Sequence, residues 1–373
     1  MKKIVKNLFI ILFSLVAIVL AAALILPYVY KDDIKARIDQ EIASKVNAHV
    51  YFSADKFDLT LFHSFPDITV TLEDFGVVGK GVFEGDTLTS IRKFRVGVDI
   101  MSVIGGGQIK VKEILLEGPR IHASRLKDGT ANWDISIPDT AAAATPASTQ
   151  PSQFSIKVSK WEIKDGEVVY SDAMLPAFAA IQGLNHSGSG DFTQDIVDLK
   201  TTTTIASLTA EYDSTEYLAN KKLDAVLNME LNLPKSAYTF KDNSIKLNEF
   251  ALAFGGKVIM EGDNIITDVN FKSTDNSIRG LISLVPGVFK KGFEDVKTDG
   301  TLGFDGYAKG TYNATTMPAF GLNLKVDKGM IQYPKLPSAI TNLTLDMSVT
   351  NPDGNLEHTL TDVRKFHIDL GKN

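Results

Sequence analysis

The side chains that most often perform catalysis are few in this sequence, and their spacing assembles no recognisable site. Cysteine is absent from the 373 residues, which excludes disulfides, Cys-ligated zinc, iron–sulfur clusters and a thiol nucleophile. None of the six histidines belongs to an HExxH motif or has a carboxylate at ligand spacing in a helix. We therefore expect neither a metal ion nor another cofactor.

Two glycine-rich segments approach known motifs without matching them. Asn185–Gly190 reads NHSGSG and is not GxSxG, because neither serine has glycine at both second neighbours, so a polar turn is favoured. Gly79, Gly81 and Gly85 miss the dinucleotide fingerprint by one place and lead into no helix. Carboxylates are numerous, but no pair is distinguished as a glycosidase pair. A protein without enzymatic activity is predicted, and a hydrolase of the cell envelope is the hypothesis with the least support.

Residues 8–30 form one uncharged apolar run that is long enough to cross a membrane. At ~1.5 Å per helical residue, roughly 23 residues exceed a hydrocarbon core of about 30 Å. Lysines precede the run, and the nearly neutral KDD follows it, so the positive-inside rule predicts a cytoplasmic N-terminus at residues 1–7. In a Gram-negative cell, this topology is a single-pass inner-membrane protein with most of its chain in the periplasm. The expected anchor residues include Leu8, Phe9, Ile10, Leu15, Val19, Leu24, Tyr28 and Tyr30.

A cleaved signal peptide is the alternative for the same run, since Ala21–Ala23 offers small residues for cleavage. Signal peptides usually carry an apolar region of ~7–15 residues, whereas this run continues to Tyr30. The retained anchor is therefore preferred.

Composition limits the remaining chain to a folded, non-basic protein. Apolar residues make up 44% of the sequence, and the formal net charge is −6, so no surface for nucleic acid is expected. After the anchor, isoleucines and Val46 recur every four residues over Lys31–Val46, which predicts an amphipathic helix. Residues 31–137 are predicted to combine this helix with a first β-sheet unit. Residues 138–153, rich in Ala, Thr, Ser and Pro, are predicted to be a flexible linker or loop.

Strands dominate residues 154–373, which form the second predicted region. The clearest alternation is Leu223–Leu233, where all odd positions are Leu, Ala or Met and even positions are mostly polar. Similar alternation occurs around Leu322 and Leu345. One short helix is expected at Asn276–Phe289, with Asp275 as its N-cap.

Two segments share the pattern [Ile/Val]-x-x-Gly-x-[Val/Ile]-x-Tyr. They are Ile163–Tyr170 and Val326–Tyr333, and each is followed by proline and then by Ile-x-x-Leu. A turn at the glycine, a strand, a proline break and the next strand would explain the pattern. The similarity predicts repeated sheet units.

The predicted strands are long, and the few predicted helices cannot cover all of their apolar side chains. Two arrangements could cover the rest. The sheet could pack on another sheet as a sandwich or barrel, or it could curl around an open apolar trough that holds acyl chains. The residue types do not distinguish these alternatives. The candidate lipid-contacting residues are Leu223, Leu227, Met229, Leu231, Leu233, Leu322, Leu324, Leu343, Leu345 and Met347.

Several motifs, in their order along the chain, resemble the AsmA-like family of Gram-negative envelope proteins. They are the anchor and following helix, Ser64–Phe75, Ile114–Ile121, Asp128–Trp133, Leu281–Pro286 with the glycines 300, 303, 306 and 310, Gly329–Pro337 and Asn351–Gly354. The resemblance implies an inner-membrane anchor and an antiparallel, taco-like β-sheet groove in the periplasm. It also implies relatedness to chorein-type bridge-like lipid transfer proteins, and a role in phospholipid transfer or homeostasis between the inner and outer membranes.

The expected partners are therefore a phospholipid or another acyl-chain lipid and the membrane itself. The competing hypothesis is a non-catalytic assembly or scaffold factor of the outer membrane, which binds envelope proteins through strand edges.

Overall fold

The computed structural model describes residues 40, 43–44, 46–53, 56, 58–60, 67–99, 101–102, 110–137, 158–192, 194–285, 295–334 and 336–371. The predicted anchor at residues 8–30, the predicted linker at 138–153 and most of the predicted helix at 31–46 lie outside these residues. Among the helices of the described part, none has the length and apolar character needed to cross a membrane.

The described residues are almost entirely β-strands, which confirms the prediction of a mostly β protein. Sixteen strands belong to one antiparallel sheet, and fifteen of them follow in chain order from β1 to β16, while β2 pairs with β3 beside this path. The chain divides into two compact units. Unit 1 comprises residues 1–124 and 130–164, and unit 2 comprises residues 125–129 and 165–373.

Unit 1 is built from the first strands and a short 3-10 helix. Its elements are β1 (His49–Tyr51), β2 (Asp58–Thr60), β3 (Ile68–Val78), η2 (Gly81–Phe83), β4 (Thr87–Val98) and most of β5 (Val111–Arg125). Strands β3 and β4 lie within the region where a first β-sheet unit is predicted. In β3, Thr69 and Thr71 alternate with apolar residues, and their side chains are nevertheless buried. Val46, predicted to end a helix, instead forms a single bridge with Ser136.

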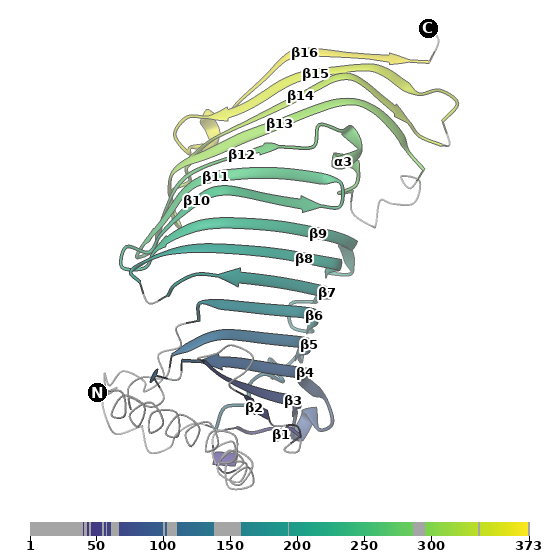
Figure 1. The fold of residues 1–373 in the computed structure, drawn as a ribbon. Coiled ribbons are helices and arrows are strands. Elements are labelled where there is room, and N and C mark those ends of the chain that lie inside the picture. The colour runs from purple at the N-terminus through teal and green to yellow at the C-terminus, as the bar shows by residue number, and fades with distance from the viewer. Residues whose placement is uncertain are drawn as a thin grey trace, which may run out of the picture. The chain divides into compact units, whose positions relative to one another are not determined.

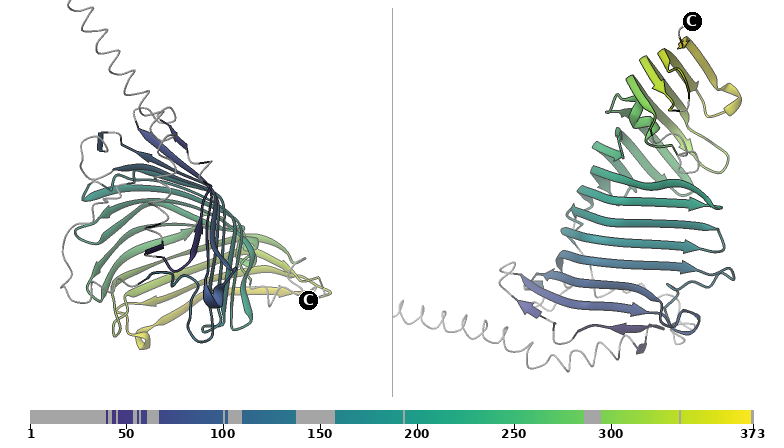
Figure 2. Two further views of the ribbon diagram at one scale, coloured as in Figure 1. Left: turned by 90° about the horizontal axis from the view of Figure 1, so that it is seen from below. Right: turned by 90° about the vertical axis from the view of Figure 1, so that its right-hand side faces the viewer.

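Unit 2 contains the second half of β6 and all later strands, which lie side by side in chain order (Figure 1). The strands are β6 (Lys160–Asp172), β7 (Ala177–Ser189), β8 (Ile196–Tyr212), β9 (Thr215–Asn232), β10 (Ala237–Leu247), β11 (Phe250–Glu261), β12 (Asn264–Ser273), β13 (Lys297–Tyr312), β14 (Ala319–Gln332), β15 (Ile340–Asn351) and β16 (Leu360–Leu370). Two short helices accompany them, α3 (Ile278–Ile282) and η5 (Leu356–His358). The longer strands bend along their length (Figure 2).

Strands β7 and β9 of unit 2 differ from the sequence-based prediction. The strand predicted at Leu223–Leu233 is longer, because β9 has 18 residues, and it ends before Leu233, which is 45% exposed. Asn185–Ser189 belongs to β7 rather than to a polar turn. The chain pairs there with β8, so local turn-forming residues were overridden by the backbone ladder.

The two copies of the repeated motif share an unusual backbone conformation. Asp165 and Lys328, which directly precede the motif glycines, have positive φ angles of 51° and 50°. The predicted turn at the glycine is wrong, because both glycines lie inside continuous strands, β6 and β14. In β14 the pairing register shifts at this point, as in a β-bulge. In β14 the repeat therefore forms a bulge within the strand, and in β6 the same positive φ occurs inside a continuous strand.

A buried carboxylate closes the β6–β7 hairpin. Asp172 is 2% exposed and accepts hydrogen bonds from the backbone N–H groups of Leu175 (2.9 Å) and Met174 (2.8 Å) and from the Tyr170 hydroxyl (2.8 Å). The Arg125 guanidinium lies 3.8 Å away. The Leu175 N–H, followed by the Tyr170 hydroxyl, lowers the pKa of Asp172 below its ordinary value.

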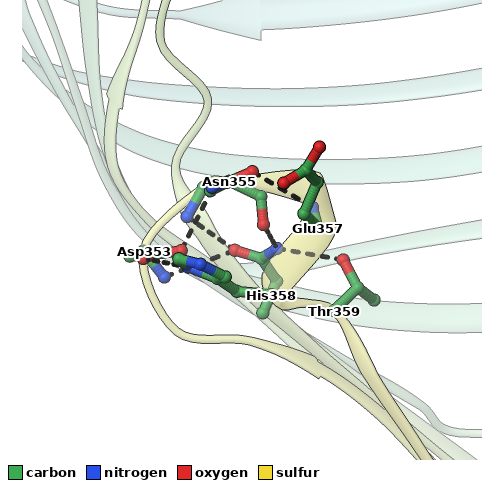
Figure 3. A network of polar contacts seen from close by, with 7 residues as sticks. Asp353, Asn355, Glu357, His358 and Thr359 are labelled. Carbon is green, nitrogen blue, oxygen red and sulfur yellow. Dashed lines mark hydrogen bonds and ion pairs between the residues drawn. The ribbon is translucent and has the colours of Figure 1, made fainter.

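A second polar network closes the β15–β16 hairpin (Figure 3). Asn351 is fully buried, and its Nδ2 donates to the Asn355 carbonyl (2.6 Å) and the Thr359 hydroxyl (3.0 Å). Its Oδ1 accepts from the backbone of Asp353 (3.3 Å), whose carboxylate in turn contacts His358 Nδ1 (2.7 Å). These hydrogen bonds pair polar backbone groups of the loop. The network is therefore explained by the stability of the hairpin and requires no functional role.

We predict that Asp172 makes the fold sensitive to acid. A carboxyl group with a lowered folded pKa stabilises the fold fully above its unfolded pKa of about 3.9, and this stabilisation is lost as the pH falls through the folded value. Asp172→Asn should lower the melting temperature of the full chain at neutral pH and flatten its decline below about pH 4. The control is Asp224→Asn, an exposed side chain on β9. Equal pH profiles for wild type and Asp172→Asn would contradict the prediction.

Candidate functional site

One face of unit 2 collects large apolar side chains across several strands, and we call it the apolar face. Cross-strand pairing brings Met229 beside Phe240 and Ala308 beside Phe320. A second row pairs Phe254 with Phe271, and further rows pair Leu322 with Val349, Phe304 with Leu324, Leu324 with Met347, and Val326 with Leu345. The pairing register shifts at the bulges, but the apolar side chains before and after each shift lie on the same face, so the rows join into one surface.

In the described part of the chain, few residues cover the apolar face. Its Met, Leu and Phe side chains are mostly half-buried, although they belong to a single layer whose strands pair only with their chain neighbours in the described part of unit 2. In a sandwich, such residues would lie in a closed core between two sheets. Among the described residues, the sandwich alternative therefore has no second sheet, and the open surface remains.

Glycine leaves room for aromatic rings on this face. A Cβ atom at Gly306 would lie 2.6 Å from the Phe271 ring and from the Gly321 carbonyl oxygen, so no other residue fits there without a shift. The Phe271 ring also packs on Phe304 with centroids 5.5 Å apart, and Phe304 packs edge-on against Phe250 at 6.1 Å. These contacts join Phe250, Phe271 and Phe304, from three strands, into one aromatic group.

Helix α3 covers one part of the apolar face, where it lies against β11 and β13 (Figure 1). Ile278 joins Phe250, Leu302 and Val326 in a buried cluster, and Ile282 and Leu284 pack around it. Among the described residues, α3 and Leu284, which follows it, cover this buried cluster.

The start of α3 differs from the prediction. Its N-cap is Ser277, whose hydroxyl accepts the Gly280 N–H (3.1 Å), rather than Asp275. Asp275 instead accepts hydrogen bonds from the Ser277 N–H (3.1 Å) and hydroxyl (3.0 Å). The helix has five residues and ends at Ile282, and the predicted positions 286–289 lie outside the described residues.

A buried lysine holds the other end of α3. Lys221 follows the alternation of β9 onto the apolar face, next to Leu223, and is only 2% exposed. Its Nζ donates a short hydrogen bond to the Ser283 carbonyl oxygen, at the C-cap of α3. Asn248 Nδ2 donates to the same oxygen at 3.4 Å. A cation at a helix C-terminus complements the helix dipole.

Most of the predicted lipid-contacting residues lie together on the apolar face. The β9 residues are Leu223, Leu227, Met229 and Leu231, the β14 residues are Leu322 and Leu324, and the β15 residues are Leu345 and Met347. Leu343 packs against the cluster under α3. Leu233 is the exception, since it follows the end of β9. Whether these residues contact lipid stays a prediction.

Sequence reasoning missed Lys221 and the phenylalanines of β10–β13. Lys221 occupies an odd position that continues the apolar alternation of Leu223 and Ala225, which is the signal that could have found it. The phenylalanines are separated by turns and bulges, so their convergence depends on the register of four strands.

The opposite face of unit 2 is polar and carries exposed ion pairs. Lys309 and Asp268 pair at 2.8 Å, and Lys241 contacts Asp198 at 2.8 Å. An open cleft of about 1010 Å³ is lined by polar residues such as Lys241, Asn270 and Asp305 and also by Phe254, Phe271 and Phe304. No group of three or more His, Asp or Glu side chains in the described part of the chain could hold a metal ion. The described residues of this face are charged and solvated, and they form no catalytic or metal-binding site that we recognise.

Comparison with known proteins assigns a family to the chain. The model of the AsmA family matches residues 1–272. No curated protein and no solved structure gives a significant match.

We predict that the cluster beneath α3 contributes strongly to the stability of unit 2. Leu302 is 2% exposed at the centre of the cluster, so Leu302→Ala should lower the free energy of unfolding by about 2–5 kcal/mol. Leu356→Ala, at a site that is 62% exposed, should change it by less than about 0.5 kcal/mol. Denaturant unfolding of the full chain measures both values. Equal effects of the two substitutions would contradict this account of the core.

Proposed function

The chain belongs to the AsmA family, and from this premise we propose that the apolar face of unit 2 binds the acyl chains of phospholipids. The observation that carries the proposal is the continuous apolar surface from β9 to β15, of which α3 and Leu284 cover one part among the described residues. Contiguous apolar surfaces of this kind usually mark a binding site. An acyl chain is the simplest ligand that is apolar throughout.

The dimensions of the face suit a lipid tail. The row from Met229 to Phe320 crosses six strands, and five inter-strand spacings of about 4.8 Å give a path of about 24 Å. One leaflet of a bilayer has a hydrocarbon thickness of about 15 Å, half of the core. Each methylene group buried on the face contributes about 0.8 kcal/mol. The polar headgroup can remain in water at the edge of the strands.

In the cell, this surface would serve phospholipid transfer or homeostasis between the inner and outer membranes. The segment at residues 8–30 would anchor the chain in the inner membrane, with its N-terminus in the cytoplasm and unit 2 in the periplasm. Transfer by burial requires no covalent step, so the proposed role is non-catalytic.

The first test places a charge on the apolar face. Met229→Lys should reduce phospholipid adducts to a photo-crosslinking amino acid at Phe240, its cross-strand neighbour, by on the order of tenfold, because each 1.4 kcal/mol of lost affinity is a factor of ten. The control is Val226→Lys, an exposed position on the other side of β9. Adducts from the full chain in cells are identified by mass spectrometry, and circular dichroism monitors the fold. Equal adduct yields from both variants would refute binding at this face.

A second candidate function is that of a scaffold that binds envelope proteins through a strand edge. The exposed apolar side chains of β16 favour it, namely Leu360, Val363, Phe366 and Leu370. Among the described strands, β16 pairs only with β15. Apolar residues beside an unpaired strand edge can support the addition of a partner strand.

The scaffold hypothesis predicts discrete protein partners. A photo-crosslinker at Val363 should then capture one protein of constant mass from cells, and Val363→Lys should prevent the capture of that protein by a crosslinker at Thr361. Recovery of phospholipid adducts alone at Val363 would favour the lipid-binding proposal instead.

A further inference from the structure

We propose that the polar face of unit 2 carries a second binding site, a groove across β10–β16 that takes a linear chain of uncharged, N-acetylated sugars. The groove lies opposite the apolar face, so the inference goes beyond the proposed function and does not depend on lipid binding. It rests on the register of the strands, on unused polar groups and on one exposed aromatic ring.

The cleft of about 1010 Å³ opens on the polar face of β10–β13. Directly paired residues share a face of a sheet. Cross-strand pairs place six of the lining residues on one face, namely Ala253, Gly255, Asn270, Lys272, Asp305 and Tyr307. The Lys309–Asp268 ion pair shares this face by the alternation of β12 and β13. The lining phenylalanines occupy the alternate positions, and their rings pack on the other side of the sheet, where Phe271 contacts Phe304.

A second cleft, of about 590 Å³, continues the first across β13–β16. Asn276 and Gly303 line both clefts, so the two adjoin, and we call them together the polar groove. Lys325, Asp346 and Lys365 extend from Gly303 in one cross-strand row. From β10 to β16 the groove crosses six inter-strand spacings of about 4.8 Å, or about 29 Å in all. A path of this length suits an extended polymer better than a single small molecule.

Gly303 keeps the junction of the two clefts open. Its φ angle is not positive, and a Cβ atom there would meet only the Lys325 side chain and carbonyl oxygen, at 3.8 and 3.9 Å. Neither backbone strain nor crowding therefore requires glycine at this position. Glycine inside a strand lowers its stability and often marks a place where a ligand approaches closely.

Tyr307 provides a flat aromatic surface in the polar groove. A Cβ atom at Gly321 would lie 2.3 Å from the Tyr307 ring, so the ring rests directly on the backbone of β14. The side chain is nevertheless 43% exposed, which leaves part of the ring open to water. The electron-rich face of an aromatic ring attracts the partly positive C–H groups on one side of a sugar ring.

Several asparagines of the polar groove have unused hydrogen-bonding capacity. In the described part of the chain, the exposed side-chain amides of Asn270 and Asn276 form no hydrogen bond. Asn243 is 3% exposed and accepts the Asn228 N–H at 2.6 Å, but its buried Nδ2 has no partner among the described residues. Unpaired buried donors are rare. An amide offers both donors and acceptors, which match the hydroxyl and acetamido groups of N-acetylated sugars.

The charges that line the polar groove cancel. The first cleft has two lysines and two aspartates, namely Lys241, Lys272, Asp242 and Asp305, and the second cleft also has two of each. A groove without net charge does not favour a polyanion such as a nucleic acid. Among the described lining residues, Tyr307 is the only large apolar side chain that is exposed, so a peptide with several apolar anchors is not favoured either. An uncharged glycan agrees with both observations.

The test titrates the full chain, held in lipid nanodiscs, with the β-1,4-linked hexamer of N-acetylglucosamine and follows binding by isothermal titration calorimetry. Tyr307→Ala should weaken binding by on the order of tenfold through loss of the stacking surface. Gly303→Gln should weaken it similarly, because its side chain fills the junction of the clefts. The matched control is Tyr312→Ala, a 49% exposed tyrosine at the end of the same strand and outside both clefts, which should leave the affinity unchanged.

The length of the sugar chain supplies an independent readout. Monomeric N-acetylglucosamine reaches only one cleft, so it should bind on the order of tenfold more weakly than the hexamer. Equal affinities would refute a continuous groove. If Tyr307→Ala lowers the melting temperature, Asn270→Ala takes its place, because this side chain is exposed and supports no other group in the described part of the chain.

Absence of hexamer binding to the wild type would overturn the site, and so would an affinity that neither the Gly303 variant nor the Tyr307 or Asn270 variant reduces. Phospholipid adducts at Phe240, on the opposite face, should be unchanged in Gly303→Gln. Glycan binding and lipid binding are thereby measured separately, and failure of one leaves the other in place.

Discussion

The register of the antiparallel ladder is the constraint on which the rest of unit 2 depends. Successive side chains of a strand point to opposite faces, so a slip by one residue would move every apolar side chain to the polar side. The bulges are placed so that this does not happen. The register shifts after Phe240 on β10 relative to both neighbouring strands, and the apolar rows continue on either side of the shift.

A single-layer sheet with this register has an unavoidable consequence. One face is solvated and carries ion pairs such as Lys309–Asp268, which contribute little because they are exposed to water and salt. The other face removes its apolar atoms from water only in part, through contacts among its own side chains. Burial of the apolar surface that remains exposed would be favourable for any group that covers it. Helix α3 already buries one part of this surface.

The strand content of unit 2 was accessible from sequence because alternation is a local signal. Leu223–Leu231 was assigned to one face from its spacing, and the structure places these residues there. The sequence shows the repeated motif but not its structure, because its Asp-Gly and Lys-Gly pairs are compatible with a turn as well as with an irregularity inside a strand. Asn185–Ser189 was misread for the opposite reason, since pairing with β8 outweighs its turn-forming composition. The partners of Phe304 and Lys221 depend on register across several strands, which one sequence does not determine.

Lys221 shows that the apolar face is not apolar throughout. The position continues the alternation of β9, yet its side chain is only 2% exposed and donates a hydrogen bond to the Ser283 carbonyl oxygen at the end of α3. A buried ammonium group needs polar partners, because desolvation otherwise disfavours its charged form. The end of α3 is therefore attached to β9 by a polar contact, while Ile278 attaches its start by apolar packing.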